Sequence, residues 1–180
     1  LGDDINGELA EDQSGWSVSL SSDGTIVAIG ANANDGNGSA AGHVRVHQWN
    51  GSAWTKIGDD IDGEAAQDQS GYSVSLSSDG TIVAIGAYAN DGNGTNAGHV
   101  RVHQWNGSVW TQIGDDIDGE AGVDESGYSV SLSEDGSSLA IGAPDNDGNG
   151  TDAGHVRVFK TKLPTLSDTD GDGVIDNIDN

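Results

Sequence analysis

Residues 17–31 read Ser-Val-Ser-Leu-Ser-Ser-Asp-Gly-Thr-Ile-Val-Ala-Ile-Gly-Ala, and this stretch decides the fold. Its first five residues alternate between polar and apolar side chains, which predicts a half-buried β-strand. The Asp-Gly pair that follows is typical of a tight hairpin turn. The continuous apolar run at the end predicts a second strand that is buried on both faces. Residues 17–31 therefore predict a β-hairpin.

The sequence on the C-terminal side extends this hairpin. A polar loop over residues 32–41 leads to an alternating segment at 43–49, which predicts a third strand. Asn50-Gly51 is a strong turn signal, and residues 54–57 after it predict a fourth strand. Residues 58–70 are expected to form an acidic loop. The unit is thus predicted to be an antiparallel meander of four strands.

The same unit occurs three times with a period of 56 residues, at 1–56, 57–112 and 113–163. Residues 1–56 match residues 57–112 at 46 of 56 positions, and residues 57–104 match 113–160 at 36 of 48 positions. Identity at this level predicts the same structure for each copy. The third copy is predicted to have only its first three strands, and the chain to begin with the end of a fourth strand at residues 1–5.

The predicted fold class is all-β, with each repeat forming one blade of a partial β-propeller. Serial four-stranded meanders also occur in solenoids and extended sandwiches. Residue size favours a propeller, because the first two strands are rich in small residues whereas Trp49 and Trp54 lie on the outer two. Propellers have about 4–8 blades. We therefore expect further blades upstream, or self-association, to cover the apolar faces of a three-blade arc.

The composition excludes several classes of partner. With a net charge of −24, the chain is expected to bind neither nucleic acid nor an anionic membrane. No apolar run is long enough to insert into a bilayer. Cysteine is absent, which excludes disulfides and thiolate metal sites, and the absence of methionine indicates a processed product or an excised fragment.

Two motifs in the third copy resemble the FG-GAP repeat of integrin α-chain propellers and their bacterial relatives. They are Ser126-Gly127-Tyr128-Ser129-Val130 and Leu139-Ala140-Ile141-Gly142-Ala143-Pro144, followed by a third strand that starts after Gly154. Serine replaces the phenylalanine of the family motif in every copy. The connection between the first two strands is too short for the calcium loop of integrins, so those calcium sites are not expected here. The resemblance implies a propeller on the outside of the cell.

The C-terminal segment, residues 164–180, resembles one thrombospondin type 3 repeat and is predicted to bind Ca²⁺. Calcium takes six to eight oxygen ligands, and Asp-x-Asp-x-Asp-Gly spacing points alternate carboxylates into one concavity. The alternative is a disordered acidic tail. The predicted ligands are Asp168, Asp170, Asp172, the carbonyl of Val174, Asp176 and Asp179.

Two further loops are weaker candidates for cation binding. The loop after the second strand of the third copy has similar spacing, and its candidate ligands are Asp145, Asp147, Asn149 and Asp152. Its alternative reading is a Gly/Asn-rich turn. The acidic loop at residues 59–64 is either a cation site or a solvated turn whose carboxylates bond local backbone N–H groups.

The histidines and the tryptophans can each be interpreted as structural or as functional residues. Histidines four residues apart on one strand lie about 13 Å apart and cannot share a metal, so we interpret them as a polar strand face that pairs with neighbouring acids. The Trp pairs that flank the Asn-Gly turns are expected to touch across each hairpin. Sugar stacking by exposed Trp is the alternative.

No arrangement of residues indicates catalysis, so the chain is predicted not to be an enzyme. We expect a calcium-binding, extracellular or cell-surface module for adhesion or for recognition of a protein or glycan ligand. A lectin-like, glycan-binding propeller is the first alternative. The second is an accessory domain of a larger secreted hydrolase.

Overall fold

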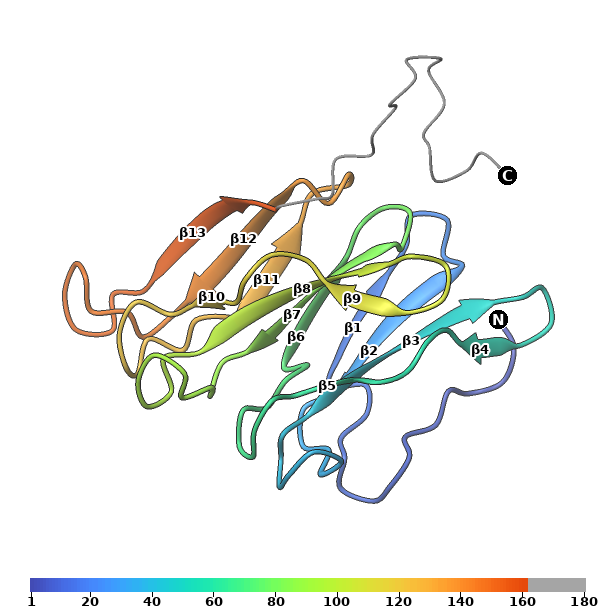
Figure 1. The fold of residues 1–180 in the computed structure, drawn as a ribbon, viewed down its shortest axis with the longest axis horizontal. Helices are drawn as coiled ribbons and strands as arrows, with labels where there is room; N and C mark the ends of the chain where they lie inside the picture. Colours follow the sequence, from blue (N-terminus) through green and yellow to red (C-terminus); the bar gives the residue numbers. More distant parts are fainter. Residues whose placement is uncertain (162–180) are drawn as a thin grey trace, which may run out of the picture.

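The computed structural model describes residues 1–161, which form three antiparallel sheets arranged side by side (Figure 1). Each sheet is one blade. Blade 1 contains β1 (Ser17–Leu20), β2 (Ile26–Ala31), β3 (His43–Trp49), β4 (Trp54–Lys56) and β5 (Ile61–Asp62). Blade 2 contains β6 (Ser73–Leu76), β7 (Ile82–Ala87), β8 (His99–Trp105), β9 (Trp110–Gln112) and β10 (Ile117–Asp118). Blade 3 contains β11 (Ser129–Leu132), β12 (Ser138–Ala143) and β13 (His155–Lys160).

The predicted meander is confirmed in all three copies. In blade 1 the strands follow the order β1-β2-β3-β4, and the described part of blade 3 has three strands. The turn between β1 and β2 is closed by Asp23, whose Oδ1 accepts hydrogen bonds from the Thr25 amide at 2.9 Å and from Ser21 Oγ at 2.7 Å. The hydrogen bond from Thr25, with that from Ser21, lowers the pKa of the Asp23 carboxyl. The Asp-Gly signal therefore acts through the aspartate side chain as well as the glycine.

The outer strand of a blade differs from its prediction. It is divided into β4 and β5, which pair with opposite ends of β3, and β5 lies within the segment that we predicted to be entirely loop. Between them the chain forms a bulge at Gly58, where φ is +74°. Residues 1–5, predicted to be the end of a fourth strand, form no strand, since no β3-like strand lies beside them to pair with.

The core lies between blades. The first cluster joins the valines of β3 to Val74 and Leu76 of β6, and an equivalent cluster joins blades 2 and 3. Hydrogen bonds tie the inner strands together across the same junction. Ser17 Oγ donates to the Gly71 carbonyl at 2.7 Å, and the Leu76 amide donates to Ser19 Oγ at 2.9 Å. Each blade therefore depends on its neighbour for both its apolar and its polar contacts.

Two glycines permit the close approach of blades 1 and 2. A Cβ on Gly30 would lie 2.0 Å from the Gly71 carbonyl oxygen, and a Cβ on Gly71 would lie 2.5 Å from the His43 carbonyl oxygen. Gly71 also has a φ of +82°, which L-residues rarely adopt. The Ser-Gly and Gly-Ala motifs that recur in each copy are thus the points where one backbone packs directly on the next.

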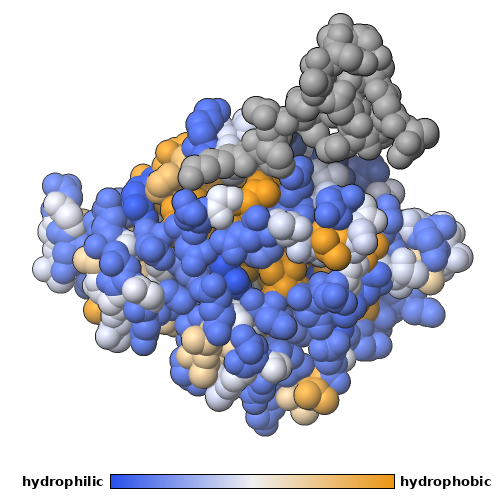
Figure 2. Space-filling view, in the orientation of Figure 1, coloured by the Kyte–Doolittle hydropathy of each residue, from blue (hydrophilic) through white to orange (hydrophobic). Residues whose placement is uncertain are grey.

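The two end faces of the stack are not covered. Val18 and Leu20 of β1 are 64% and 59% exposed, and Val156 and Val158 of β13 are 68% and 72% exposed. Hydrophilic residues cover most of the face seen in Figure 2, and apolar residues gather in a few patches. The described residues therefore form part of a propeller whose apolar faces are open at both ends.

Candidate functional site

An aromatic cluster lies where the inner strands begin. Trp16, Tyr72 and Tyr128 each directly precede the innermost strand of a blade, and Tyr88 follows β7. The ring centroids of Tyr72 lie 5.5 Å from Trp16, 5.0 Å from Tyr128 and 4.3 Å from Tyr88. Trp16 is 52% exposed and Tyr128 is 42% exposed. The result is a solvent-facing group of rings that spans all three blades, which we call the aromatic platform.

The loops before the platform hold their backbone in a rarely populated conformation. Gln13, Gln69 and Glu125 have φ angles of 57°, 56° and 56°, in the left-handed region. The carbonyl of each accepts a hydrogen bond from the amide of the platform residue three positions later, at 3.0–3.1 Å. Non-glycine residues persist in this region where the surrounding structure over-determines them, and such positions cluster at binding sites. The backbone that carries Trp16, Tyr72 and Tyr128 is therefore fixed by these loops.

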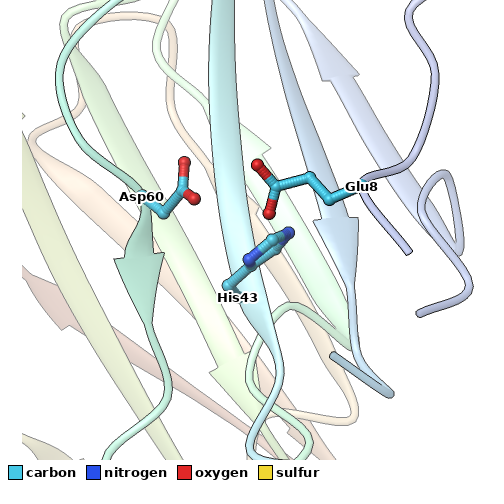
Figure 3. Close-up of side chains that lie close together, drawn as sticks. All are labelled: Glu8, His43 and Asp60. Carbon is cyan, nitrogen blue, oxygen red and sulfur yellow. The ribbon is translucent and has the colours of Figure 1, made fainter. Parts of the chain in front are cut away.

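A second group combines histidine with carboxylates, and it occurs twice. Glu8, His43 and Asp60 place their ligand atoms within 4.8 Å of one another, and Figure 3 shows the Glu8 and Asp60 carboxylates on two sides of the space next to the imidazole. The histidine opens β3, the aspartate lies in the bulge between β4 and β5, and the glutamate comes from the N-terminal segment. Blade 2 repeats the arrangement with Glu64, His99 and Asp116. We call these groups the His-carboxylate clusters.

One oxygen of each carboxylate in the second cluster is already held by another side chain. Glu64 Oε1 lies 3.5 Å from the Arg101 guanidinium, and Asp116 Oδ1 accepts a 2.6 Å hydrogen bond from Gln112. The other oxygens, Glu64 Oε2 and Asp116 Oδ2, lie 3.9 and 4.0 Å from His99 Nδ1. These distances are too long for hydrogen bonds. The carboxylates are thus oriented toward an imidazole that they do not touch.

The two cluster histidines are 2% exposed. Burial lowers the pKa of His43 and of His99, and the adjacent arginines act in the same direction, whereas the nearby carboxylates oppose the shift. The imidazoles are therefore neutral near pH 7. A neutral imidazole has a free ring nitrogen, which is the form that binds metal ions.

The structure places the predicted calcium ligands of the third copy in the loop between β12 and β13. Asp147 Oδ1 accepts a 2.8 Å hydrogen bond from the Asp152 amide, and Asp35 and Asp91 cap the same turn in the other copies. Asp145 is half-buried and its charge raises the pKa of Glu125, although burial is the larger cause. Calcium binding by this loop remains a prediction. The six predicted calcium ligands of residues 164–180 lie outside the described residues.

The Trp pairs contact each other as predicted, with centroids 5.7 Å apart for Trp49 and Trp54. The structure adds a second contact. Trp54 Nε1 donates to the Leu1 carbonyl, and Trp110 Nε1 donates to the Ile57 carbonyl, both at 3.0 Å. Each pair therefore holds the outer segment that precedes it in the chain, through the indole N–H of Trp54 in the first pair and of Trp110 in the second.

The sequence predicted that the histidine strand face pairs with acids, but it did not predict the two His-carboxylate clusters. Successive members of each cluster are 35 and 17 residues apart in the sequence, and they meet only when a bulge and an inter-blade loop reach the start of β3 or β8. The sequence did contain a pattern that indicates the aromatic platform. An aromatic residue follows Ser-Gly in every copy, at Trp16, Tyr72 and Tyr128.

The fold and the repeated Ser-Gly and Gly-Ala contacts define three blades of a β-propeller. A model of the FG-GAP repeat matches residues 6–46, 61–102 and 116–159, so the chain belongs to the FG-GAP repeat family. The match confirms the resemblance inferred from these motifs.

A comparison with solved structures supports the fold. The periplasmic gluconolactonase of Pseudomonas aeruginosa is similar, with a TM-score of 0.54 and 16% identity. The similar region covers 80% of this chain and 38% of the gluconolactonase. Comparison with curated proteins gives no match. At this identity the likeness to the enzyme concerns the fold alone.

In the described part of the chain, no helix is long and apolar enough to cross a membrane. FG-GAP repeats are typical of extracellular and cell-surface proteins.

Proposed function

We propose that this chain is a non-catalytic, extracellular or cell-surface recognition module that binds a protein ligand through its aromatic platform. The observation that carries the proposal is the exposure of Trp16 and Tyr128 beside the packed rings of Tyr72 and Tyr88. Tyr and Trp are the residues most enriched at the centres of protein interfaces, because they bury large areas at low entropic cost. Rigid loops support this role, since pre-organised rings lose little freedom on binding.

A screen against extracellular proteins, followed by ring-removal variants, tests the proposal. We expect Trp16→Ala and Tyr128→Ala each to weaken binding at least about tenfold, the effect of an interface hot spot. Val109→Ala is the matched control, because Val109 is exposed on the hairpin of blade 2, between β8 and β9, and not in the platform. Equal affinity of the two platform variants and the control would remove the platform from the binding surface.

Glycan recognition is the second candidate, and the same exposed rings favour it. The Trp pairs are weaker glycan sites because one indole N–H of each pair, that of Trp54 or Trp110, already binds a backbone carbonyl. A glycan array probed with the wild-type chain, with Tyr128→Ala and with Trp54→Ala distinguishes these surfaces. Loss of a glycan signal in Tyr128→Ala alone places the sugar on the platform, and loss in Trp54→Ala alone places it on the Trp pair.

We also propose that residues 164–180 bind Ca²⁺ and that the cation links the module to a following domain. Five aspartate carboxylates within twelve residues repel one another unless a cation is present. Calorimetric titration of the full chain tests this, with Asp170→Ala/Asp172→Ala as the test variant and Glu134→Ala as the control, because Glu134 is exposed and lies outside every candidate cation loop. If the first pair leaves calcium binding unchanged, the C-terminal assignment is wrong.

A further inference from the structure

The two His-carboxylate clusters have the donor set of a transition-metal site. We propose that Glu8-His43-Asp60 and Glu64-His99-Asp116 each bind a divalent transition-metal ion, with Zn²⁺ the best match. One imidazole nitrogen and two carboxylate oxygens, completed by water, form a zinc ligand set of the open kind. Calcium prefers oxygen ligands alone, six to eight of them. The ligand chemistry therefore separates these clusters from the proposed calcium segment.

The buried histidines supply the observation that points to a ligand. His43 and His99 are each 2% exposed. The carboxylate oxygens beside His99 Nδ1, at 3.9 and 4.0 Å, are too distant to form hydrogen bonds with it. The imidazole and the carboxylates therefore lie close together without a hydrogen bond between them. In both clusters two carboxylates face that imidazole from different segments of chain. A cation at the centre would satisfy all three groups.

Zinc binding would require the ligand atoms to move only slightly closer together. Zinc bonds of about 2.0–2.2 Å place neighbouring ligand atoms about 3.4 Å apart, whereas the oxygens of Glu64 and Asp116 now lie 3.9 and 4.0 Å from His99 Nδ1. Both acids are partly exposed, at 45% and 32% of their side chains, so they can move inward. Their remaining oxygens are held by Arg101 and Gln112, which gives the outer support that tunes metal ligands.

The two clusters differ in one neighbour, and this difference predicts their order of affinity. Lys56 pairs with Asp60 at 2.7 Å in the first cluster, whereas the neutral Gln112 takes this place beside Asp116 in the second. The extra positive charge in the first cluster opposes a cation. We therefore expect the second cluster to bind zinc more tightly than the first.

Zinc titration of the full chain by calorimetry, with saturating Ca²⁺ present, tests the proposal. We expect His43→Gln/His99→Gln to lose two zinc ions per chain, one for each cluster. His103→Phe is the control, because phenylalanine occupies the equivalent position in β13. Asp116→Asn keeps the size of its side chain and should lose one ion. Unchanged zinc uptake in the double variant, or no uptake by the wild-type chain, overturns the proposal.

Charge exchange and Co²⁺ absorption sharpen the test. Gln112→Lys should weaken the second cluster at least about tenfold, and Lys56→Gln should strengthen the first by a similar factor, as expected for one added or removed charge near the ion. Co²⁺ bound in place of zinc should give a visible absorption band that disappears in the histidine double variant. No response to either charge exchange would place the metal elsewhere.

A separate observation, the two open end faces, carries a second inference. We infer that two copies of this chain associate head to tail, with blade 3 of one copy packed on blade 1 of the other. Val156 and Val158 repeat the positions of Val44 and Val46, which are buried against Val74 and Leu76 of the next blade. Val18 and Leu20 repeat the positions of Val74 and Leu76. The open faces are therefore the two halves of an interface that the chain already forms twice.

The N-terminal segment is already placed for this contact. Trp54 holds the Leu1 carbonyl as Trp110 holds the Ile57 carbonyl, and Arg45 holds the Asn6 carbonyl at 2.9 Å as Arg101 holds that of Asp62. Residues 5–6 thus contact blade 1 in the same way that β5, the last strand of blade 1, contacts blade 2. In a head-to-tail pair they would lie beside β13 of the other copy and complete its sheet. Six blades fall within the usual range for a closed propeller.

Light scattering across a concentration series tests the association. We expect a dimer for the wild-type chain, a monomer for Val156→Asp/Val158→Asp, and a dimer for the control Val109→Asp, which is exposed away from both faces. High salt should strengthen the dimer because each copy carries a net charge of −24. A wild-type monomer, or open polymers of increasing length, overturns the closed pair.

Discussion

Strands β8 and β13 carry the same sequence, His-Val-Arg-Val, but they lie in different surroundings. Val100 and Val102 of β8 are 0% and 4% exposed because blade 3 covers them, whereas Val156 and Val158 of β13 are 68% and 72% exposed. The local pairing is the same, since both strands join the preceding strand in the same register. The comparison teaches that burial in this fold is a property of the junction between blades. Three tests of it follow, in order of expected effect.

The largest effect is expected from placing a charge on each strand. Val100→Asp should lower the free energy of unfolding by at least about 4 kcal/mol, because it buries an unpaired carboxylate. Val156→Asp should change it by less than about 0.5 kcal/mol in the monomer. Chemical denaturation at low protein concentration measures both values. Equal losses would show that β13 is covered in solution.

A smaller effect is expected where backbones meet at a blade junction. Gly71→Ala should destabilise by about 3 kcal/mol, because the new Cβ would collide with the His43 carbonyl and the positive φ would be strained. Gly15 occupies the same motif in blade 1 and has a φ of +92°, but a Cβ added there would meet no atom within 4 Å. Gly15→Ala should therefore cost only about 1 kcal/mol. Thermal unfolding of both variants measures the two losses of stability, and their difference is the contribution of the blade junction. Equal losses would show that the junction contributes nothing.

The third test uses pH and the exchange of histidine for phenylalanine between β8 and β13. Burial lowers the pKa of His103 from 6.5 to about 4, and Arg101 adds to the shift. The unfolded chain takes up a proton near pH 6.5 and the folded chain does not. Stability is therefore full above that pH and falls as the pH drops toward 4, by at most roughly 3 kcal/mol from this residue.

His103→Phe, which copies Phe159 of β13, should flatten this loss in urea melts at pH 7, 5.5 and 4. His103→Gln removes the titration without adding apolar area and should flatten the same window. A wild-type pH dependence that survives in both variants would assign the acid sensitivity to other groups, such as His47, whose pKa burial also lowers.

The fold was largely predictable from local patterns. Alternation, the Asp-Gly turn and the apolar run located β1 to β4, and the 56-residue period carried this result to the other copies. The division of the outer strand was not predictable. At the bulge, Gly58 packs against the Trp pair of the next blade, Trp105 and Trp110. Contacts of this kind have no periodicity that a single repeat reveals.

The sites were less predictable than the fold. The sequence alone indicated acid-rich loops, a histidine strand face and an aromatic residue after each Ser-Gly. It did not indicate that Glu64 and Asp116 would face His99 from two separate segments, or that Tyr72 and Tyr88 would pack into one platform.

By itself, the sequence determined the strands, the meander and the repeat, because side-chain alternation and turn chemistry act over a few residues. Tertiary structure decided which valines are buried, which histidines are held neutral and which rings gather at the start of the inner strands. The physical reason is that desolvation and packing depend on what lies across each face, and a repeated sequence presents the same face whether or not a neighbouring blade covers it.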